Sequence, residues 1–151
     1  ASLDYLNQNA KNDKRVLLVV TDGWDNASSY TLEQAVRTLQ AENPPLIYCI
    51  GLIDSDDTRA MKHTEQRALQ SLSGATGGVS YFPKNLGQVD AITRQVAHDI
   101  RTQYSFSYRS NQTGSGYRTI RVEVKDPKLK HLSVRSRQGY FHGAAAQAPA
   151  H

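Results

Sequence analysis

The sequence has little cysteine, little tryptophan and no long apolar run. Its 151 residues include one cysteine and one tryptophan. The single Cys49 excludes a disulfide within the chain and a CxxC metal site. It lies in the apolar run from Leu46 to Ile50, where a buried and unreactive thiol is the usual role. No run approaches the roughly 18–20 apolar residues that span a bilayer. Cysteine usage therefore leaves the cellular compartment open.

The N-terminal residues lack the features of a signal peptide and of a transit peptide. They are typical of the end of a helix, so we expect the natural protein to begin further upstream. Hydrophobic residues make up 38% of the chain, which is below the usual range for globular proteins. Because they gather in short dense runs, we expect a modest core rather than a disordered chain.

Charge divides the chain into two parts. Residues 1–103 carry ten Lys/Arg and twelve Asp/Glu, a net charge of −2. Residues 104–151 carry eight Lys/Arg and two Asp/Glu, a net charge of +6. The division predicts a boundary near Gln103, with an α/β unit at 1–103 and a basic β-unit at 104–142. The small residues of 143–151 predict a disordered tail.

The first unit alternates apolar runs with amphipathic segments. Residues 16–20 form an unbroken aliphatic run, typical of a strand that is buried on both faces. Thr31 and Gln34 form a capping-box pattern before a helix that begins at Leu32 and ends before Pro44. The alternation of strand and helix signals predicts a parallel sheet.

The same alternation continues to the end of the first unit. A second strand is predicted at 46–53, a helix that ends at the glycines from 74 to 78, a third strand at 79–83 and a long helix from 89 to 101. Beyond the boundary, the period-two patterns at 104–109, 117–125 and 132–137 predict strands exposed on one face. We expect these strands to form an antiparallel hairpin or meander.

The run from Arg15 to Asn26, RVLLVVTDGWDN, resembles the fourth strand and following loop of a von Willebrand factor A-type (vWA) domain. An apolar-Gly strand end at Gly51, a helix closed by Thr-Gly-Gly at 76–78 and a Tyr-Phe strand at 81–82 follow in the family's order. Residues 104–141 resemble the tail of bacterial, acidobacteria-like vWA-related proteins. The resemblance implies the C-terminal part of a three-layer vWA or Rossmann-like α/β domain, and it implies an exported, periplasmic or extracellular protein.

The resemblance also implies a role for Asp22. In the family, the Asp of the strand-end TDG sequence belongs to a metal-ion-dependent adhesion site that usually holds Mg²⁺, and Thr21 or Asp25 would assist through water. The ion leaves one position for a carboxylate of a protein partner. Trp24 and Asn26, in the same loop, are candidate partner-binding residues. The alternative is that Asp22 only caps the following turn.

The chain departs from the family pattern at the metal ligands. The family's DxSxS motif and its later Thr are absent, and the run from Asp25 to Ser29 is a near miss that has Ala27 in place of the first Ser. We therefore expect Mg²⁺ binding to be weak or absent in this chain. Without neighbours, strand 16–20 would expose an apolar edge, so we also expect self-association through that edge.

Two other groups of charged residues have more than one interpretation. Three aspartates at 54, 56 and 57 lack EF-hand spacing, so a solvated loop is favoured. Five cations of the basic unit alternate with apolar residues near three tyrosines at 104, 108 and 117 and could bind nucleic acid or another anionic polymer. The cations are Arg118, Arg121, Lys125, Arg135 and Arg137. Such alternation is more often only the solvated face of a sheet.

Three functions follow from these observations. The first is a non-enzymatic adhesion or scaffolding module of vWA type, in which a metal takes part only in a longer chain. The second is an anionic-polymer or nucleic-acid binder that uses the basic β-unit. The third, a Mg²⁺-dependent hydrolase built on Asp22 and Asp25, lacks a general base or nucleophile at recognisable spacing. We favour the first.

Overall fold

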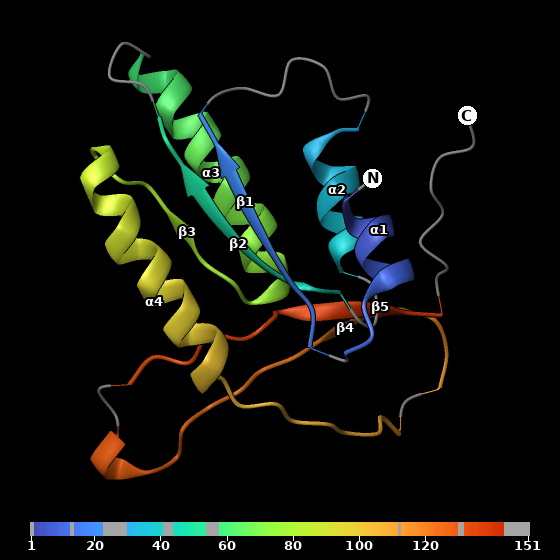
Figure 1. The fold of residues 1–151 in the computed structure, drawn as a ribbon. Helices are drawn as coiled ribbons and strands as arrows, with labels where there is room; N and C mark the ends of the chain where they lie inside the picture. The colour runs from blue at the N-terminus through green and yellow to red at the C-terminus, as the bar shows by residue number, and fades with distance from the viewer. Residues whose placement is uncertain are drawn as a thin grey trace.

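The computed structural model describes residues 2–12, 14–22, 30–40, 44–53, 58–111, 113–129 and 132–143. In these ranges the chain forms four α-helices, five strands and two short 3₁₀ turns (Figure 1). Their order is α1 (Ser2–Asn9), β1 (Val16–Thr21), α2 (Leu32–Leu39), β2 (Leu46–Gly51), α3 (Arg59–Thr76), β3 (Ser80–Tyr81), η1 (Leu86–Gln88), α4 (Val89–Thr102), β4 (Gly116–Thr119), η2 (Pro127–Leu129) and β5 (Gly139–His142). No helix among the described residues is long and apolar enough to cross a membrane.

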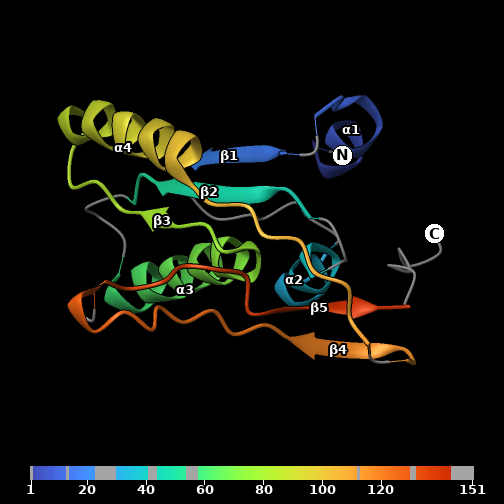
Figure 2. The same ribbon diagram turned by 90° about the horizontal axis from the view of Figure 1, so that it is seen from below.

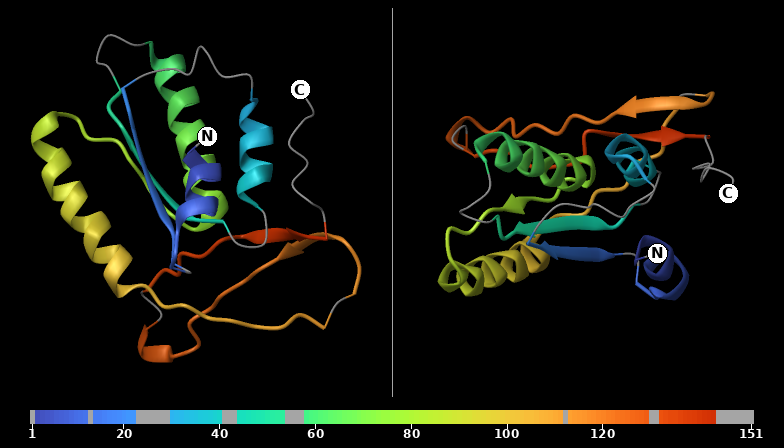
Figure 3. Two further views of the ribbon diagram at one scale, coloured as in Figure 1. Left: turned by 45° about the vertical axis from the view of Figure 1, so that its right-hand side comes forward. Right: turned by 90° about the horizontal axis from the view of Figure 1, so that it is seen from above.

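The first unit is a three-stranded parallel sheet with helices on both faces. The strand order is β1-β2-β3, with Leu18 opposite Tyr48 and Cys49 opposite Ser80. Helices α2 and α3 lie on one face and α4 lies on the other (Figures 2 and 3). The predicted parallel α/β arrangement of the first unit is therefore confirmed.

The capping box predicted before α2 is present. Gln34 donates its backbone N–H to the Thr31 hydroxyl at 3.2 Å, and Thr31 donates its backbone N–H to the Gln34 side-chain oxygen at 2.8 Å. These two bonds satisfy backbone donors that the first turn of a helix otherwise leaves unpaired.

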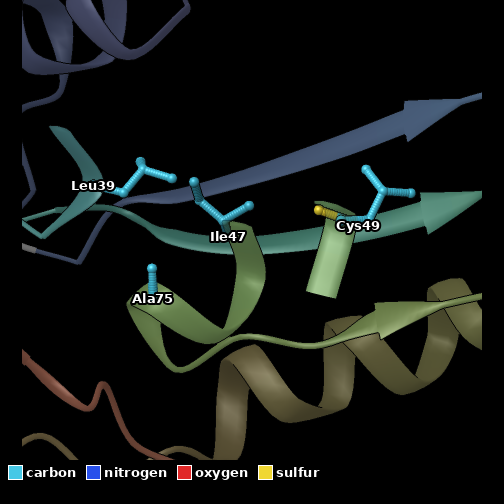
Figure 4. Packing of buried hydrophobic residues seen from close by; sticks show 5 residues of the cluster. Leu39, Ile47, Cys49 and Ala75 are labelled. Carbon is cyan, nitrogen blue, oxygen red and sulfur yellow. The ribbon is translucent and has the colours of Figure 1, made fainter. Parts of the chain in front are cut away.

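The core lies around β2. Four successive β2 residues, 47 to 50, are at most 3% exposed, because β2 has a strand on each side and helices over both faces. On one face Ile47 and Cys49 pack with Leu39 of α2 and with Leu69 and Ala75 of α3 (Figure 4). An unbroken apolar run suits such a strand, because neither face meets water.

The end of α3 is tied to the start of β2. The Thr76 hydroxyl accepts the backbone N–H of Ile47 at 2.9 Å and donates to the Ser73 carbonyl at 3.0 Å. Gly77 ends the helix in the left-handed conformation, with φ of 87°. A Cβ at Gly78 would lie 1.7 Å from the Ile47 carbonyl oxygen, so only glycine fits there.

The second unit contains a two-stranded antiparallel sheet of β4 and β5, with Tyr117 opposite Phe141. Residues 120–138 separate the two strands, so a long connection rather than a tight turn joins them. A Cβ at Gly139 would lie 2.4 Å from the Arg118 carbonyl oxygen and 2.6 Å from the Tyr117 ring. The close approach of these strands therefore needs Gly139.

Two strand predictions in this unit are wrong. Residues 104–109 and 132–137 form no strand. Of the predicted strand 117–125, only residues 117–119 form a strand, as part of β4. The alternation of side chains is present in the sequence, but only β4 and β5 pair, with a close approach at Gly139, and Arg135 is bonded to Asp99 of α4. The predicted tail, from 144 onward, lies outside the described residues.

The two units meet at three helix ends. Phe141 of β5 donates its backbone N–H to the Gln40 carbonyl at 2.7 Å, at the end of α2. Gly77, at the end of α3, lies against the backbone of Ser136 and Arg137. Arg135 pairs with Asp99 near the end of α4.

We predict opposite effects for two glycine substitutions at the end of α3. Gly78→Ala should lower the free energy of unfolding by about 2 kcal/mol or more, because the methyl group would overlap the Ile47 carbonyl. Gly74→Ala should raise it by about 0.5–1 kcal/mol, because Gly74 is helical and has open space at its Cβ position. Urea denaturation of both variants measures the difference, and equal stabilities would contradict this account of the helix end.

Candidate functional site

Asp22 lies at the carboxyl edge of the parallel sheet. It follows directly after Thr21, the last residue of β1, and it is exposed. The Thr21 carbonyl accepts the backbone N–H of Leu52 at 2.8 Å, which extends the β1–β2 ladder to the end of the strand. Open α/β sheets bind ligands at this edge. The structure therefore presents the Asp22 carboxylate to solvent where the sequence predicted it.

The residues described around Asp22 do not form a complete Mg²⁺ site. Mg²⁺ prefers about six oxygen ligands in an octahedron. Thr21 is half-buried and Asp22 is exposed, and together they offer two side-chain groups. In the described ranges, no group of three or more His, Cys, Asp or Glu side chains is placed to hold a metal ion.

Several predicted site residues fall outside the described ranges. These are the metal candidate Asp25, the partner-binding candidates Trp24 and Asn26, and the acidic residues Asp54, Asp56 and Asp57. Both of these segments adjoin the carboxyl edge in sequence, since the first follows β1 and the second follows β2.

An apolar strand face lies next to Asp22. β1 is the edge strand of the three-stranded sheet, and no strand of the described chain pairs with its outer side. Leu18 and Val20 are 42% and 56% exposed, whereas Tyr48 of β2, which is opposite Leu18 in the register, is 3% exposed. Parallel strands are usually covered on both faces. This edge, made by Leu18, Val20 and the following Asp22, is called the β1 edge below.

The five candidate anion-binding cations do not share one environment. The Arg118 and Arg137 guanidinium groups lie 6.0 and 4.9 Å from the ring centre of Tyr140. Arg118 also donates to the Gly114 carbonyl at 3.2 Å. Tyr140 is 6% exposed, so these two cations cover a buried ring rather than stand in solvent.

The other three cations have different surroundings from Arg118 and Arg137. Arg121 lies 2.5 Å from Glu123 in an exposed ion pair, and Arg135 lies 2.7 Å from Asp99. Lys125 is exposed. The structure thus brings Arg118 and Arg137 together at Tyr140 but engages Arg121 and Arg135 with carboxylates, which reduces the positive field available to an anionic ligand.

The ion pair of Asp99 and Arg135 joins the two units. The Asp99 side chain is only 9% exposed, and it also accepts a hydrogen bond from Gln95 at 2.8 Å. Burial alone would raise the pKa of Asp99. The hydrogen bonds from Arg135 and Gln95, together with the charge of Arg135, outweigh this and hold the pKa below its usual 3.8. The same contact raises the pKa of Arg135.

The ion pair also affects the pKa of Tyr48, a residue of β2. Burial raises the pKa of Tyr48, and the charge of Asp99 raises it further while Arg135 lowers it. The hydroxyl of this tyrosine is therefore neutral at physiological pH.

Sequence reasoning did not identify Asp99 or Tyr140 as organising residues. Asp99 is 36 residues from its partner Arg135, and Tyr140 is 32 residues from Tyr108, whose hydroxyl donates to the Tyr140 hydroxyl at 3.2 Å. The only sequence signal near Asp99 was the helical periodicity of 89–101. That periodicity predicts which face of the helix is apolar, but it does not predict which polar residues contact Asp99.

Comparisons with known proteins identify no relative. No protein-family model matches the chain, and neither a curated protein nor a solved structure matches it.

We predict that Asp99→Asn weakens the attachment of residues 132–137 to α4. Loss of the charged contact should lower the free energy of unfolding at pH 7 by about 1 kcal/mol, because the Arg135 side chain is half exposed and solvent screens the pair. Asp99 has a lowered folded-state pKa, so its contribution is fully present above the unfolded pKa and is lost as pH falls through the folded pKa.

The difference in the free energy of unfolding between wild type and Asp99→Asn should therefore be constant from neutral pH down to about 5, and should shrink as the pH falls below the unfolded pKa toward the lower folded pKa. Urea unfolding at a series of pH values measures it. Asp90→Asn is the matched control, because Asp90 forms an exposed i,i+4 pair with Arg94 on the same helix and should change stability less. A difference that persists unchanged into acid would contradict the assignment.

Proposed function

We propose that this chain is the C-terminal part of a vWA-type domain and acts as a non-enzymatic protein-binding module for adhesion or scaffolding. The observation that supports it best is the β1 edge, where an exposed apolar strand face adjoins the Asp22 carboxylate at the carboxyl edge of a parallel sheet. This edge offers both apolar area and a polar group that can orient a partner.

Strand addition is the mode of binding that fits this edge. An edge strand has backbone N–H and C=O groups on its outer side that can pair with a strand of another chain. Leu18 and Val20 would be covered by the apolar side chains of the added strand or of the element that carries it. The energy would come from burying these side chains, and the register would come from the backbone bonds.

The metal has a limited place in this proposal. In a longer chain that supplies the missing oxygen ligands, Asp22 would help to hold Mg²⁺, and the ion would accept a carboxylate from the protein partner. In the present chain the apolar β1 edge can bind a partner without the metal. The proposed partner is therefore a second copy of this chain, bound at the β1 edge.

We predict that the wild-type chain self-associates and that Val20→Lys raises the dissociation constant at least about tenfold, which corresponds to about 1.4 kcal/mol. A lysine on an edge strand opposes strand pairing because its charge would have to be desolvated. Sedimentation velocity over a range of concentrations measures the change.

Leu86→Lys is the matched control, because Leu86 is 76% exposed on η1, which is not part of either sheet, and its replacement should not change self-association. A wild-type chain that remains monomeric at high concentration would contradict the proposal.

The basic β-unit supports a second candidate function, the binding of an anionic polymer or nucleic acid. Its support is the net charge of +6 in residues 104–151 and the convergence of Arg118 and Arg137 at Tyr140. Against it, Arg121 and Arg135 are paired with carboxylates. We favour the protein-binding function for this reason.

The two functions predict different behaviour on immobilised heparin. Protein binding at the β1 edge predicts elution below about 0.15 M salt, because few cations are free to displace counterions. Retention above that concentration, with an affinity that falls steeply with salt and decreases in Lys125→Ala, would favour the second function. Lys11→Ala, which removes an equal charge from the first unit, is the control.

A further inference from the structure

Residues 104–109 carry the most exposed aromatic side chains of the basic unit. Tyr104, Phe106 and Tyr108 are 87%, 81% and 60% exposed. The rings of Tyr104 and Phe106 stack with their centres 6.2 Å apart. Two residues of an extended chain span about 6.6 Å, so these rings stand side by side on one side of an extended segment.

The backbone of this segment is unpaired within the described chain. No backbone–backbone hydrogen bond among the described residues involves positions 104–109, although the sequence there has the alternation of a strand. The segment runs along the outer margin of the molecule, away from the parallel sheet (Figure 1). One polar contact fixes it, the bond from the Tyr108 hydroxyl to the Tyr140 hydroxyl. An extended segment with free backbone groups and apolar side chains can accept another strand.

The sequence of the segment indicates which strand fits. Tyr104-Ser105-Phe106-Ser107-Tyr108 reads the same in both directions. We infer that this segment pairs with the same segment of a second copy of the chain, in antiparallel orientation, about a two-fold axis at Phe106. Because the segment is palindromic, antiparallel pairing centred on Phe106 places identical residue types opposite each other, which it would not do for a sequence without this symmetry.

The proposed register satisfies the side chains on both faces. Each Tyr104 lies opposite Tyr108 of the other copy, the two Phe106 rings meet at the axis, and each Ser105 lies opposite Ser107. Aromatic pairs and serine pairs are favourable across antiparallel strands. At the ends Gln103 lies opposite Arg109, so no like charges face each other. A two-fold contact of this kind is closed and produces a dimer.

The alternative partners fit less well. The strands of the same unit, β4 and β5, pair with each other, and no backbone–backbone bond among the described residues joins either of them to 104–109. Beyond β4 the chain alternates charged residues at 121, 123 and 125 with apolar ones, and it offers no aromatic row to match the segment. Nucleic acid would require cations beside the rings. The segment itself contains only Arg109, and the two arginines near Tyr108, Arg118 and Arg137, already lie against the Tyr140 ring. A two-stranded ladder of this length is marginally stable, so the dimer should be reversible.

A cysteine on the axis tests the contact directly. In Phe106→Cys the two thiols would meet across the dyad, where opposite Cα atoms of antiparallel strands are about 4.5–5.5 Å apart, within the range of a disulfide. We expect a covalent dimer under mild oxidation, formed at least tenfold faster than in Leu86→Cys. Cys49 remains in both variants, because it is fully buried and its thiol pKa is raised by burial. Phe106 is exposed, so the substitution should leave the fold intact.

A charge on the axis tests the same contact without cross-linking. In Phe106→Glu two carboxylates would face each other, so in a Val20→Lys background, which weakens association at the β1 edge, the dissociation constant of the dimer should rise at least tenfold in sedimentation experiments, with Leu86→Glu unchanged. Equal cross-linking rates for Phe106→Cys and Leu86→Cys would overturn the inference. So would a monomer in which the amides of 104–109 are protected from hydrogen exchange, since the segment would then pair within its own chain. The disulfide reports only contacts at Phe106, so its outcome is independent of the proposed β1 edge.

Discussion

The close approach of α3 to β2 is the constraint on which the rest of the fold depends. The Thr76 hydroxyl bridges the Ile47 amide and the Ser73 carbonyl, and Gly78 lets the chain pass over the Ile47 carbonyl where no side chain fits. This contact sets how α3 lies on the sheet. It thereby completes the burial of β2 and fixes the β1–β2 ladder that carries Asp22 to the carboxyl edge.

The second unit is held by different forces from the first. The first unit is organised by apolar burial around β2, whereas the second attaches through an ion pair, a backbone hydrogen bond and an arginine–aromatic contact. Arg37 of α2 lies 5.3 Å from the centre of the Phe141 ring, which strengthens the contact between β5 and the end of α2. Because such contacts are weaker and more solvated than a core, the second unit leaves much of its apolar surface exposed.

The sequence predicted the first unit well because its signals are local. The aliphatic run at 16–20 and the capping box at Thr31 each specify structure within a few residues, and the strand and the cap are both present. The expectation that this strand is buried on both faces is wrong, because β1 is at the edge of the sheet and leaves Leu18 and Val20 exposed. The position of Asp22 at the carboxyl end of a strand was predicted from the same aliphatic run, because Asp22 follows directly after the strand. The second unit was predicted less well, because its pairing depends on Gly139 meeting Tyr117 and on Arg135 meeting Asp99. Contacts between residues so far apart in the chain leave no periodic signal in the sequence.

The attachment of β5 to α2 has a mechanical consequence. The last described strand is bonded to the Gln40 carbonyl rather than to the parallel sheet. Tension applied to the chain beyond His142 would therefore load β5 and the end of α2 first, and would peel away the basic unit before it reached β2. A tether attached at that end could be stretched while the layered sheet stayed intact.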